Sequence, residues 1–325
     1  MQHRRQSAPV LIAGFVLIVL AGCIPSDDSS DGTDRDTQPV LESDRTGATI
    51  RLAYPEWSSE IASAHLFQAV LQDRLGYRVE LIPVPVEEMW KSVAEGEADI
   101  LVGAWLPVTH RDYAEEYGDR LVDLGPNLEG ARVGLVVPTS TPGRQTDSTG
   151  SSGRELVTIR SIPEMSTTVD RFAGRITGIE SGAGVMARTR DALEVYGLDR
   201  DYRVLDTAES VMVDRVAEAV FRDNWIVVTG WTPHWMFERY SLRFLDDPEG
   251  VFGGPEAIHT MIREGFAEDF PDAATVVDNV AYEPRDLERL MRWIHEDDEG
   301  DAYGQALRWI NSHESTVDEW ITEGD

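Results

Sequence analysis

Apolar runs of strand length alternate with amphipathic stretches along most of this chain, and the alternation predicts strands separated by helices. The apolar runs predict strands at residues 49–54, 79–84, 98–103, 133–138, 175–179, 203–205 and 225–229. The amphipathic stretches predict helices at residues 58–75, 87–94, 185–196 and 210–221. Beyond residue 240 we expect a short strand, an apolar segment at residues 258–262 and a helical tail to residue 321. Strands that alternate with helices are typical of βαβ units, so we predict an α/β fold with a largely parallel sheet.

The predicted elements fall into two sets, which we expect to form two lobes with a ligand cleft between them. The chain crosses from one set to the other near Val137 and again near Tyr240. We therefore assign residues 49–137 plus 241–325 to lobe 1 and residues 138–240 to lobe 2. Within lobe 2, residues 139–153 are rich in Ser, Thr, Gly and Pro and predict a surface loop. Two crossings permit a hinge, about which such lobes close on a ligand.

A tryptophan stands at or just beyond the C-terminal end of three of the predicted strands, each time beside a Pro or Gly turn signal. The three are Trp57, Trp105 and Trp231. Ligands of open α/β sheets bind outside the carboxyl ends of the strands. A single tryptophan at such a place is most often an ordinary core aromatic. Three at equivalent places favour a cleft for a cation that has no hydrogen to donate, such as a quaternary ammonium group.

A glycine-rich turn at residues 178–187 lies between a predicted strand and a predicted helix. It contains the G-x-G-x-x-A pattern of a dinucleotide fingerprint. The N-terminal residues 1–22 predict export, and an exported protein has no nucleotide pool to draw on, so we expect no such cofactor. The free N–H groups at a helix start attract any anion, and a carboxylate fits there as well as a phosphate. The alternative is a helix start that is capped by its own residues.

His110, five residues beyond Trp105, is a candidate donor to an anionic ligand group, although a lone histidine there is more often a surface or capping residue. His234 and His259 are interpreted as structural, with ring nitrogens bonded to the backbone. No histidine pair has metal-ligand spacing on a predicted helix, so no metal site is expected. The chain also lacks a G-x-S-x-G elbow. The remaining tryptophans that we assign to packing are Trp90, Trp225, Trp293, Trp309 and Trp320.

Residues 1–22 are typical of an export signal, with basic residues at Arg4 and Arg5 and a short apolar run that follows. The apolar run is shorter than a typical transmembrane helix requires. It ends in Leu-Ala-Gly before Cys23, a sequence that resembles a bacterial lipobox, so Cys23 is the predicted lipidation site. Because Cys23 is the single cysteine, no disulfide forms within the chain. Residues 23–48 have few aliphatic side chains and predict a flexible acidic tether.

The formal net charge is −30 at pH 7, and Lys91 is the single lysine. A charge this negative argues against nucleic acid and anionic lipid surfaces as partners. It also implies self-repulsion that salt relieves. We interpret the acidic composition as adaptation to a salty setting, with compositional drift as the alternative. A salt-adapted exported protein makes an osmolyte a natural ligand.

Together these motifs resemble the glycine betaine/choline-type substrate-binding proteins of ABC importers, which have a type II periplasmic-binding-protein-like fold. The resemblance extends from about Thr49 to Trp320. It is carried by the runs at residues 53–60, 104–110, 127–138, 178–186 and 229–237. It implies that Trp57, Trp105 and Trp231 box a trimethylammonium group. It also implies that the amides of Gly184 and Val185, together with His110, hold a carboxylate.

The function implied is an exported, lipid-anchored receptor, periplasmic or on the outer face of the cytoplasmic membrane, that delivers glycine betaine to a permease without covalent chemistry or a cofactor. Choline, carnitine, proline betaine and sulfonium osmolytes are alternative ligands. A sensory partner for a membrane receptor would share the same box. An exported hydrolase is a further alternative and would need Ser58, Ser59 or Thr109 as nucleophile beside His110 or His234.

Overall fold

The computed structural model describes residues 48–139 and 155–322. The predicted signal segment, the lipidation site Cys23, the tether and nearly all of the predicted loop at residues 139–153 lie outside the described residues. Within the described ranges, no helix is long and apolar enough to cross a membrane.

The strands of the described residues join in one sheet path, in the order β2-β1-β3-β9-β4-β7-β5-β6, with β8 paired to β4. The strands are β1 Thr49–Tyr54, β2 Arg78–Pro83, β3 Ile100–Leu106, β4 Leu121–Pro138, β5 Arg175–Thr177, β6 Arg203–Leu205, β7 Val228–Thr232, β8 Leu242–Phe244 and β9 Glu256–Arg263. The α-helices are α1 Ser58–Ala69, α2 Val86–Ala94, α3 Arg111–Tyr117, α4 Gly184–Val195, α5 Glu209–Phe221, α6 Met236–Arg239, α7 Phe266–Asp269, α8 Pro271–Asn279, α9 Pro284–Glu296, α10 Ala302–Ser312 and α11 Glu314–Ile321.

The prediction of a largely parallel sheet is wrong for the middle of this path. β1 is parallel to β2 and β3, and β5 is parallel to β6 and β7. In contrast, β9 is antiparallel to β3 and β4, and β4 is antiparallel to β7 and β8. Apolar periodicity reports which residues are buried in a strand, but it does not report the direction in which the strand runs.

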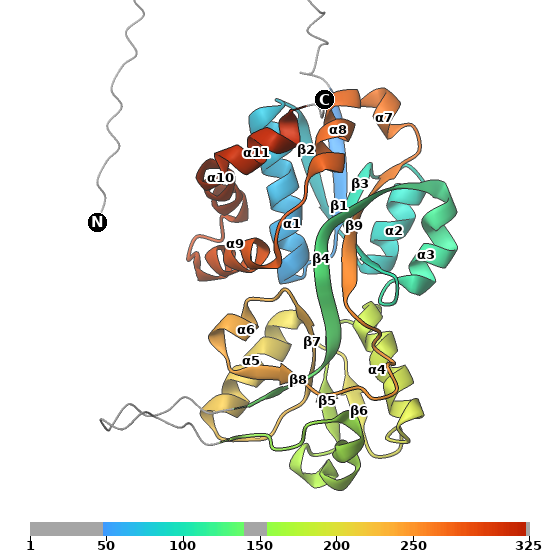
Figure 1. Cartoon of the computed structure of the whole chain (residues 1–325), viewed down its shortest axis with the longest axis vertical. Helices are drawn as coiled ribbons and strands as arrows, with labels where there is room; N and C mark the ends of the chain where they lie inside the picture. Colours follow the sequence, from blue (N-terminus) through green and yellow to red (C-terminus); the bar gives the residue numbers. More distant parts are fainter. Residues whose placement is uncertain (1–47, 140–154, 323–325) are drawn as a thin grey trace, which may run out of the picture. The chain divides into compact units, whose positions relative to one another are not determined.

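Strand β4 carries the chain from one group of elements to the other (Figure 1). Its first part, from Leu121 to Ala131, pairs with β9, and its last part, from Arg132 to Pro138, pairs with β7 and β8. Three shifts of register interrupt the pairing of β4 with β9. Two of the three shifts span Gly125 and Gly130, whose positive φ angles suit bulges. The boundaries of the two lobes stay a prediction.

Helix α1 is buried on most of its surface, because it packs against the sheet on one side and against α9 and α10 on another (Figure 1). Small residues such as Ala62, Ser63 and Ala64 permit the close approach of these neighbours. Its first turn also buries the carboxyl group of Glu60. The predicted helix at residues 58–75 continues past α1 as a single π-helical turn at Val70–Arg74 and ends before Gly76.

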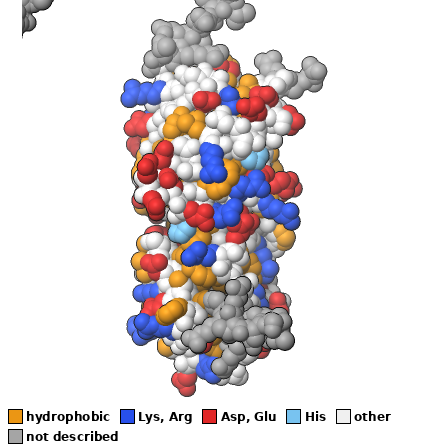
Figure 2. Space-filling view, turned by 90° about the vertical axis from the view of Figure 1, so that its left-hand side faces the viewer, with side chains coloured by type: hydrophobic (Ala, Val, Ile, Leu, Met, Phe, Trp, Pro, Cys, Tyr) orange, Lys and Arg blue, Asp and Glu red, His pale blue; other side chains and the backbone are white. Residues whose placement is uncertain are grey.

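Acidic and basic side chains are interspersed on the face that Figure 2 shows. Several of these groups form ion pairs on the surface, such as Arg222 with Glu218 at 3.1 Å and Arg292 with Glu238 at 3.4 Å. Exposed pairs of this kind contribute little to stability. A buried exception is Asp99, which accepts hydrogen bonds from Arg51 Nε at 3.1 Å and Arg263 Nε at 2.7 Å.

Asp99→Asn is expected to lower the free energy of unfolding at pH 7 by about 1–2 kcal/mol, because it removes a charge-assisted link between β1 and β9. Burial raises the pKa of Asp99, but the hydrogen bonds from Arg51 and Arg263 outweigh burial and leave the pKa below its usual value. A lowered folded-state pKa means that the stabilisation is present above the pKa of the unfolded chain, about 4, and is lost as the pH falls through the folded-state pKa.

Urea unfolding of Asp99→Asn and the wild type at neutral and acidic pH measures this difference. The gap between the two proteins should narrow in acid. Glu88→Gln is the matched control, because Glu88 pairs with Lys91 on the surface at 3.7 Å. An equal loss of stability in Glu88→Gln and Asp99→Asn at pH 7 would contradict the assignment.

Candidate ligand-binding site

One pocket of the described residues brings together all six of the predicted binding residues. They are Trp57, Trp105, His110, Gly184, Val185 and Trp231, with Ser59, Thr109, Val133, Ile179 and Ala183 as the other lining residues. These residues come from segments up to 174 positions apart in the sequence, since Trp57 and Trp231 meet at the same place. Their function as ligand contacts stays a prediction, which the geometry below supports.

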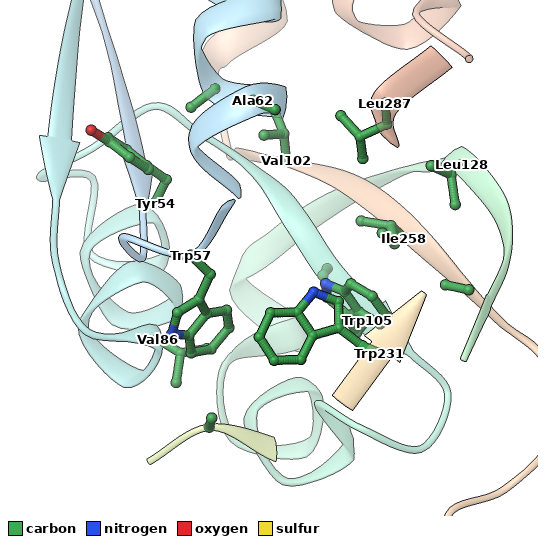
Figure 3. Close-up of a cluster of buried hydrophobic side chains, with 14 of the residues drawn as sticks. Tyr54, Trp57, Ala62, Val86, Val102, Trp105, Leu128, Trp231, Ile258 and Leu287 are labelled. Atoms are coloured by element: carbon green, nitrogen blue, oxygen red, sulfur yellow. The ribbon is translucent and has the colours of Figure 1, made fainter. Parts of the chain in front are cut away.

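The three indole rings come from three different elements (Figure 3). Trp57 is the N-cap residue of α1, Trp105 lies in β3, and Trp231 lies in β7. All three side chains are buried, and the ring centroids of Trp57 and Trp231 are 6.4 Å apart with their planes at 52°. Rings that converge at such angles offer several π faces to one small cation.

The other end of the pocket is the start of α4, where Gly184 and Val185 are the first two helical residues. Their N–H groups have no acceptor within the described residues, as is usual for the first turn of a helix. The N-cap residue is Ala183, and no side chain caps this helix start. No side chain therefore takes up the N–H groups of Gly184 and Val185, although the Met186 amide donates to the Ala183 carbonyl within the same turn. The positive end of the helix dipole therefore lies at the pocket wall.

His110 is buried and is held in one orientation by its surroundings. Its Nδ1 accepts a hydrogen bond from the Trp105 amide at 3.2 Å, and Trp90 and Tyr113 contact the ring edge-on. Burial lowers the pKa of His110 to about 3, so the imidazole is neutral at pH 7. The Trp105 contact assigns the ring proton to Nε2, and a hydrogen bond with the Gly103 backbone favours the protonated ring without outweighing burial. His110 is therefore a neutral hydrogen-bond donor in the wall of the pocket.

The turn that carries His110 is held by Glu256, the first residue of β9. Glu256 accepts hydrogen bonds from the amides of Val108 at 2.6 Å and Thr109 at 2.8 Å, and also from the Thr109 hydroxyl. The carboxylate is buried, and it satisfies two backbone donors that would otherwise be buried without partners. Glu256 thus links the turn at residues 108–109 to the start of β9.

Glu256→Ala is expected to lower the free energy of unfolding by about 2 kcal/mol and to weaken ligand binding, because it frees the turn at residues 108–110. Urea unfolding and a ligand titration measure the two effects. The control is Glu129→Ala, at an exposed position of the neighbouring strand β4. Unchanged stability in Glu256→Ala would show that the two amides find other acceptors.

Hydrogen bonds also join the two sides of the pocket directly. Trp57 Nε1 donates to Glu180 Oε2 at 2.9 Å, and the Tyr113 hydroxyl donates to the Gly182 carbonyl at 2.7 Å. On another edge, Glu209 accepts hydrogen bonds from the Ser58 amide at 2.8 Å and from the Ser58 hydroxyl. Each of these contacts links a segment that precedes β4 with a segment between β4 and β8.

The carboxylates Glu60, Glu180, Glu209 and Glu256 are the residues around the pocket that the sequence analysis missed. Three of them bond to partners at least 123 positions away in the chain, and no local pattern reports such a pairing. Glu60 is the exception. It lies one helical turn after Trp57, on a face of α1 where a charged residue would have been expected to meet solvent.

The other predictions about histidine and tryptophan have mixed outcomes. His234 Nδ1 accepts from the Met236 amide at 3.0 Å, as predicted, but its Nε2 bonds to Glu209 at 3.0 Å. The backbone bonding predicted for His259 is wrong, since its Nδ1 bonds to Asp123 at 2.8 Å. The tryptophans assigned to packing are either buried, as Trp90, Trp309 and Trp320 are, or partly buried under an arginine, as Trp225 and Trp293 are.

The described residues contain no group of three or more His, Cys, Asp or Glu side chains that could hold a metal ion. Two of the nucleophiles considered for a hydrolase have no suitable base. Ser58 and His234 both bond to Glu209 rather than to each other, and Thr109 donates to Glu256. A Ser–His pair in direct contact, which nucleophilic catalysis needs, is therefore not formed by these residues.

Comparison with known proteins identifies the family. The sequence model of the substrate-binding domain of ABC-type glycine betaine transport systems (OpuAC) matches residues 48–312. The glycine betaine/carnitine transport binding protein GbuC of Listeria monocytogenes is 41% identical over 150 residues, which is 46% of this chain and 49% of GbuC. The chain thus matches about half the length of this curated relative.

Two solved structures resemble the chain over most of its length. Lactococcal OpuAC, in its closed conformation with glycine betaine, is 34% identical with a TM-score of 0.75, and the match covers 84% of this chain and 99% of OpuAC. The glycine betaine/L-proline-binding protein ProX of Borrelia burgdorferi is 32% identical with a TM-score of 0.77, and the match covers 85% and 97% of the two chains. The fold is therefore the mixed α/β fold of periplasmic binding proteins. Proteins of this family are non-enzymatic, extracytoplasmic receptors of import systems. This chain belongs to the family of substrate-binding domains of ABC-type glycine betaine transport systems.

Proposed function

We propose that this protein captures glycine betaine outside the cytoplasm and delivers it to the permease of an ABC importer. The observation that carries the proposal is that one pocket is lined by three indole rings, by a helix start without a side-chain cap and by a neutral histidine. The two ends of this pocket have the chemistry that the two ends of a betaine zwitterion require. The ligands named for GbuC and for the solved relatives support the same class of substrate.

The trimethylammonium group would lie against Trp57, Trp105 and Trp231. It has no hydrogen to donate, so ring faces and dispersion must hold it, and each ring contributes roughly 0.5–2 kcal/mol. The rings are buried, which removes the water that would otherwise screen this attraction. Fixed rings also cost little entropy when the ligand arrives.

The ligand carboxylate would accept hydrogen bonds from the amides of Gly184 and Val185 and from His110 Nε2. The two amides belong to the first turn of α4, so the helix dipole adds to their attraction for an anion. A neutral His110 contributes a donor without a full charge. Such an arrangement favours a zwitterion over choline, which has no carboxylate to satisfy these donors.

We further propose that ligand binding closes two lobes, composed of residues 49–137 plus 241–325 and of residues 138–240. Trp57, Trp105 and His110 belong to the first lobe, and Gly184, Val185 and Trp231 belong to the second. A ligand that contacts both lobes binds the closed form more tightly than the open form. That difference in affinity is the driving force for closure.

The lipid anchor and the adaptation to high salt are proposed from the sequence. Cys23 would carry lipid after cleavage of residues 1–22, and the acidic tether would let the receptor reach its permease. The net charge of −30 supports a protein that works at high salt, where an osmolyte importer is useful.

Calorimetric titration of the purified protein in high salt with glycine betaine, carnitine, choline and proline tests the proposal. We expect saturable one-to-one binding of glycine betaine and weaker binding of choline. Choline binding as tight as that of betaine would contradict the carboxylate contacts. Absence of binding by any quaternary ammonium compound, in a protein that circular dichroism shows to be folded, would overturn the assignment of the ligand class.

A further inference from the structure

The carboxyl group of Glu60 contacts the indole N–H of Trp105, one of the three pocket tryptophans. Glu60 Oε1 accepts a hydrogen bond from Trp105 Nε1 at 3.0 Å. Glu60 Oε2 has no hydrogen-bond partner within the described residues. The carboxyl packs against the backbone of β3 at Gly103, where an added Cβ would lie 1.9 Å from Oε2. Glu60 is 1% exposed, so water does not reach it freely.

No described basic side chain forms an ion pair with Glu60, and this distinguishes it from Glu209. Glu209 is also buried, but it receives hydrogen bonds from the Ser58 amide and hydroxyl and pairs with His234 at 3.0 Å. Burial raises the pKa of Glu209, yet His234 and Ser58 outweigh burial and lower it overall. Glu60 has less compensation, because the hydrogen bonds with Trp105 and with the Ser59 side chain lower its pKa without outweighing burial.

The titratable groups around Glu60 add no positive charge that would replace an ion pair. From α5, Glu209 is anionic and opposes ionisation of Glu60. From the segment before α9, Tyr282 is neutral and bonds to the Ser63 hydroxyl at 2.8 Å. Beyond β3, His110 is neutral, and the nearby His234 is already paired with Glu209. Burial, with a further contribution from Glu209, raises the pKa of Glu60 to about 7 even though hydrogen bonds with Trp105 and Ser59 lower it.

We propose that Glu60 is a specificity-determining residue that supplies the negative charge beside the aromatic box, and that capture of a quaternary ammonium ion expels a proton from its carboxyl group. The proposal rests on the proposed function. Before binding, a fraction of the molecules carries Glu60 as a neutral acid. The cationic head of the ligand stabilises the carboxylate, so the O–H bond of Glu60 breaks and the proton passes to the buffer. No other bond changes.

The direction of the effect follows from linkage. A ligand that favours the ionised form lowers the pKa of Glu60, so affinity rises as the pH rises through that pKa. A decrease of about one unit makes the affinity about tenfold higher well above the pKa than well below it. The Trp105 indole transmits the charge, since an N–H group that donates to a carboxylate leaves its ring a stronger partner for a cation. Choline has no carboxylate of its own, so its affinity should depend more strongly on pH than that of glycine betaine.

Calorimetric titration of the full chain with glycine betaine near pH 7, in two buffers that differ in ionisation enthalpy, counts the protons released. We expect release of a fraction of one proton by the wild type and affinity that increases between about pH 6 and pH 8. Glu60→Gln keeps an acceptor for Trp105 but cannot ionise, so it should release no proton and should bind with little pH dependence. Glu97→Gln, at an exposed position, is the control and should match the wild type.

Proton release by Glu60→Gln equal to that of the wild type would overturn the proposal, and so would wild-type binding without proton release. Either result leaves the proposed function intact. Absence of glycine betaine binding at any pH would contradict both the proposed function and the proposed role of Glu60. If Glu60→Gln does not fold, the indole N–H resonance of Trp105 in the wild type gives the answer. It should titrate near pH 7 without ligand and at lower pH with saturating glycine betaine. A Trp105 resonance that is independent of pH would contradict the proposal.

Discussion

Gly184→Ala is expected to weaken the binding of glycine betaine by about a hundredfold or more, which corresponds to about 2.7 kcal/mol or more, while the protein still folds. Gly184 begins α4 and faces the turn that carries His110. A Cβ at this position would lie 2.1 Å from the carbonyl oxygen of Thr109 and 2.7 Å from its Cγ2. Backbone atoms cannot yield as a flexible side chain can, so the two sides of the pocket would have to separate.

The separation would move the amides of Gly184 and Val185 away from His110, and the ligand carboxylate could no longer reach all three donors. Titration calorimetry measures the loss of affinity, and thermal unfolding without ligand checks the fold. Gly182→Ala is the matched control in the same turn, because its Cβ would meet Tyr113 and Val86 at 3.8 and 3.9 Å, which are ordinary contacts. Wild-type affinity in Gly184→Ala would contradict the close approach of the two segments as the bound state.

Replacing Trp57 and Trp231 together with alanine is expected to weaken binding by about a hundredfold, and replacing either one or Trp105 alone by about tenfold. The two rings are neighbours in the pocket, with centroids 6.4 Å apart. Each contributes roughly 0.5–2 kcal/mol to holding a quaternary ammonium group, so the loss of both is about 1–4 kcal/mol. Equilibrium titration of each variant with glycine betaine measures these losses.

Trp309→Ala is the matched control for the tryptophan variants. Trp309 is buried in α10, remote from the pocket-lining residues, where it stacks on Trp320 with ring centroids 5.8 Å apart. Its loss should lower the free energy of unfolding by about 3–5 kcal/mol and leave the affinity unchanged. Unchanged affinity in any of the three pocket variants would remove that tryptophan from the site.

Strands and helices whose buried residues form a regular apolar pattern along the chain could be predicted from the sequence. β1 has the predicted bounds, and α4 and α5 begin one residue before their predicted starts. The first part of β4 was missed, because many of its residues between Leu121 and Gly130 are exposed or partly exposed and do not form an apolar run. The direction of β4 and β9 depends on which strands they contact, and these contacts join residues far apart in the chain.

The pocket residues could be predicted because each belongs to a local motif at the end of a strand or the start of a helix. The buried carboxylates around the pocket could not be predicted, and the physical cause is the same for each of them. A buried acidic residue is stable only with specific donors, and the donors to Glu209 and Glu256 come from distant segments. Glu60 is harder still, because its burial depends on close packing against Gly103 of β3.

We expect Trp57, Trp105 and Trp231 to enclose the trimethylammonium group of glycine betaine. Intermolecular nuclear Overhauser effects from the N-methyl protons of bound ligand test this most directly, since the methyl protons have one sharp resonance. The nine indole systems can be assigned with single Trp→Phe variants. We predict effects to the rings of Trp57, Trp105 and Trp231 and none to Trp309 or Trp320. Effects to other rings only, at saturating ligand, would place the ligand elsewhere and contradict the account.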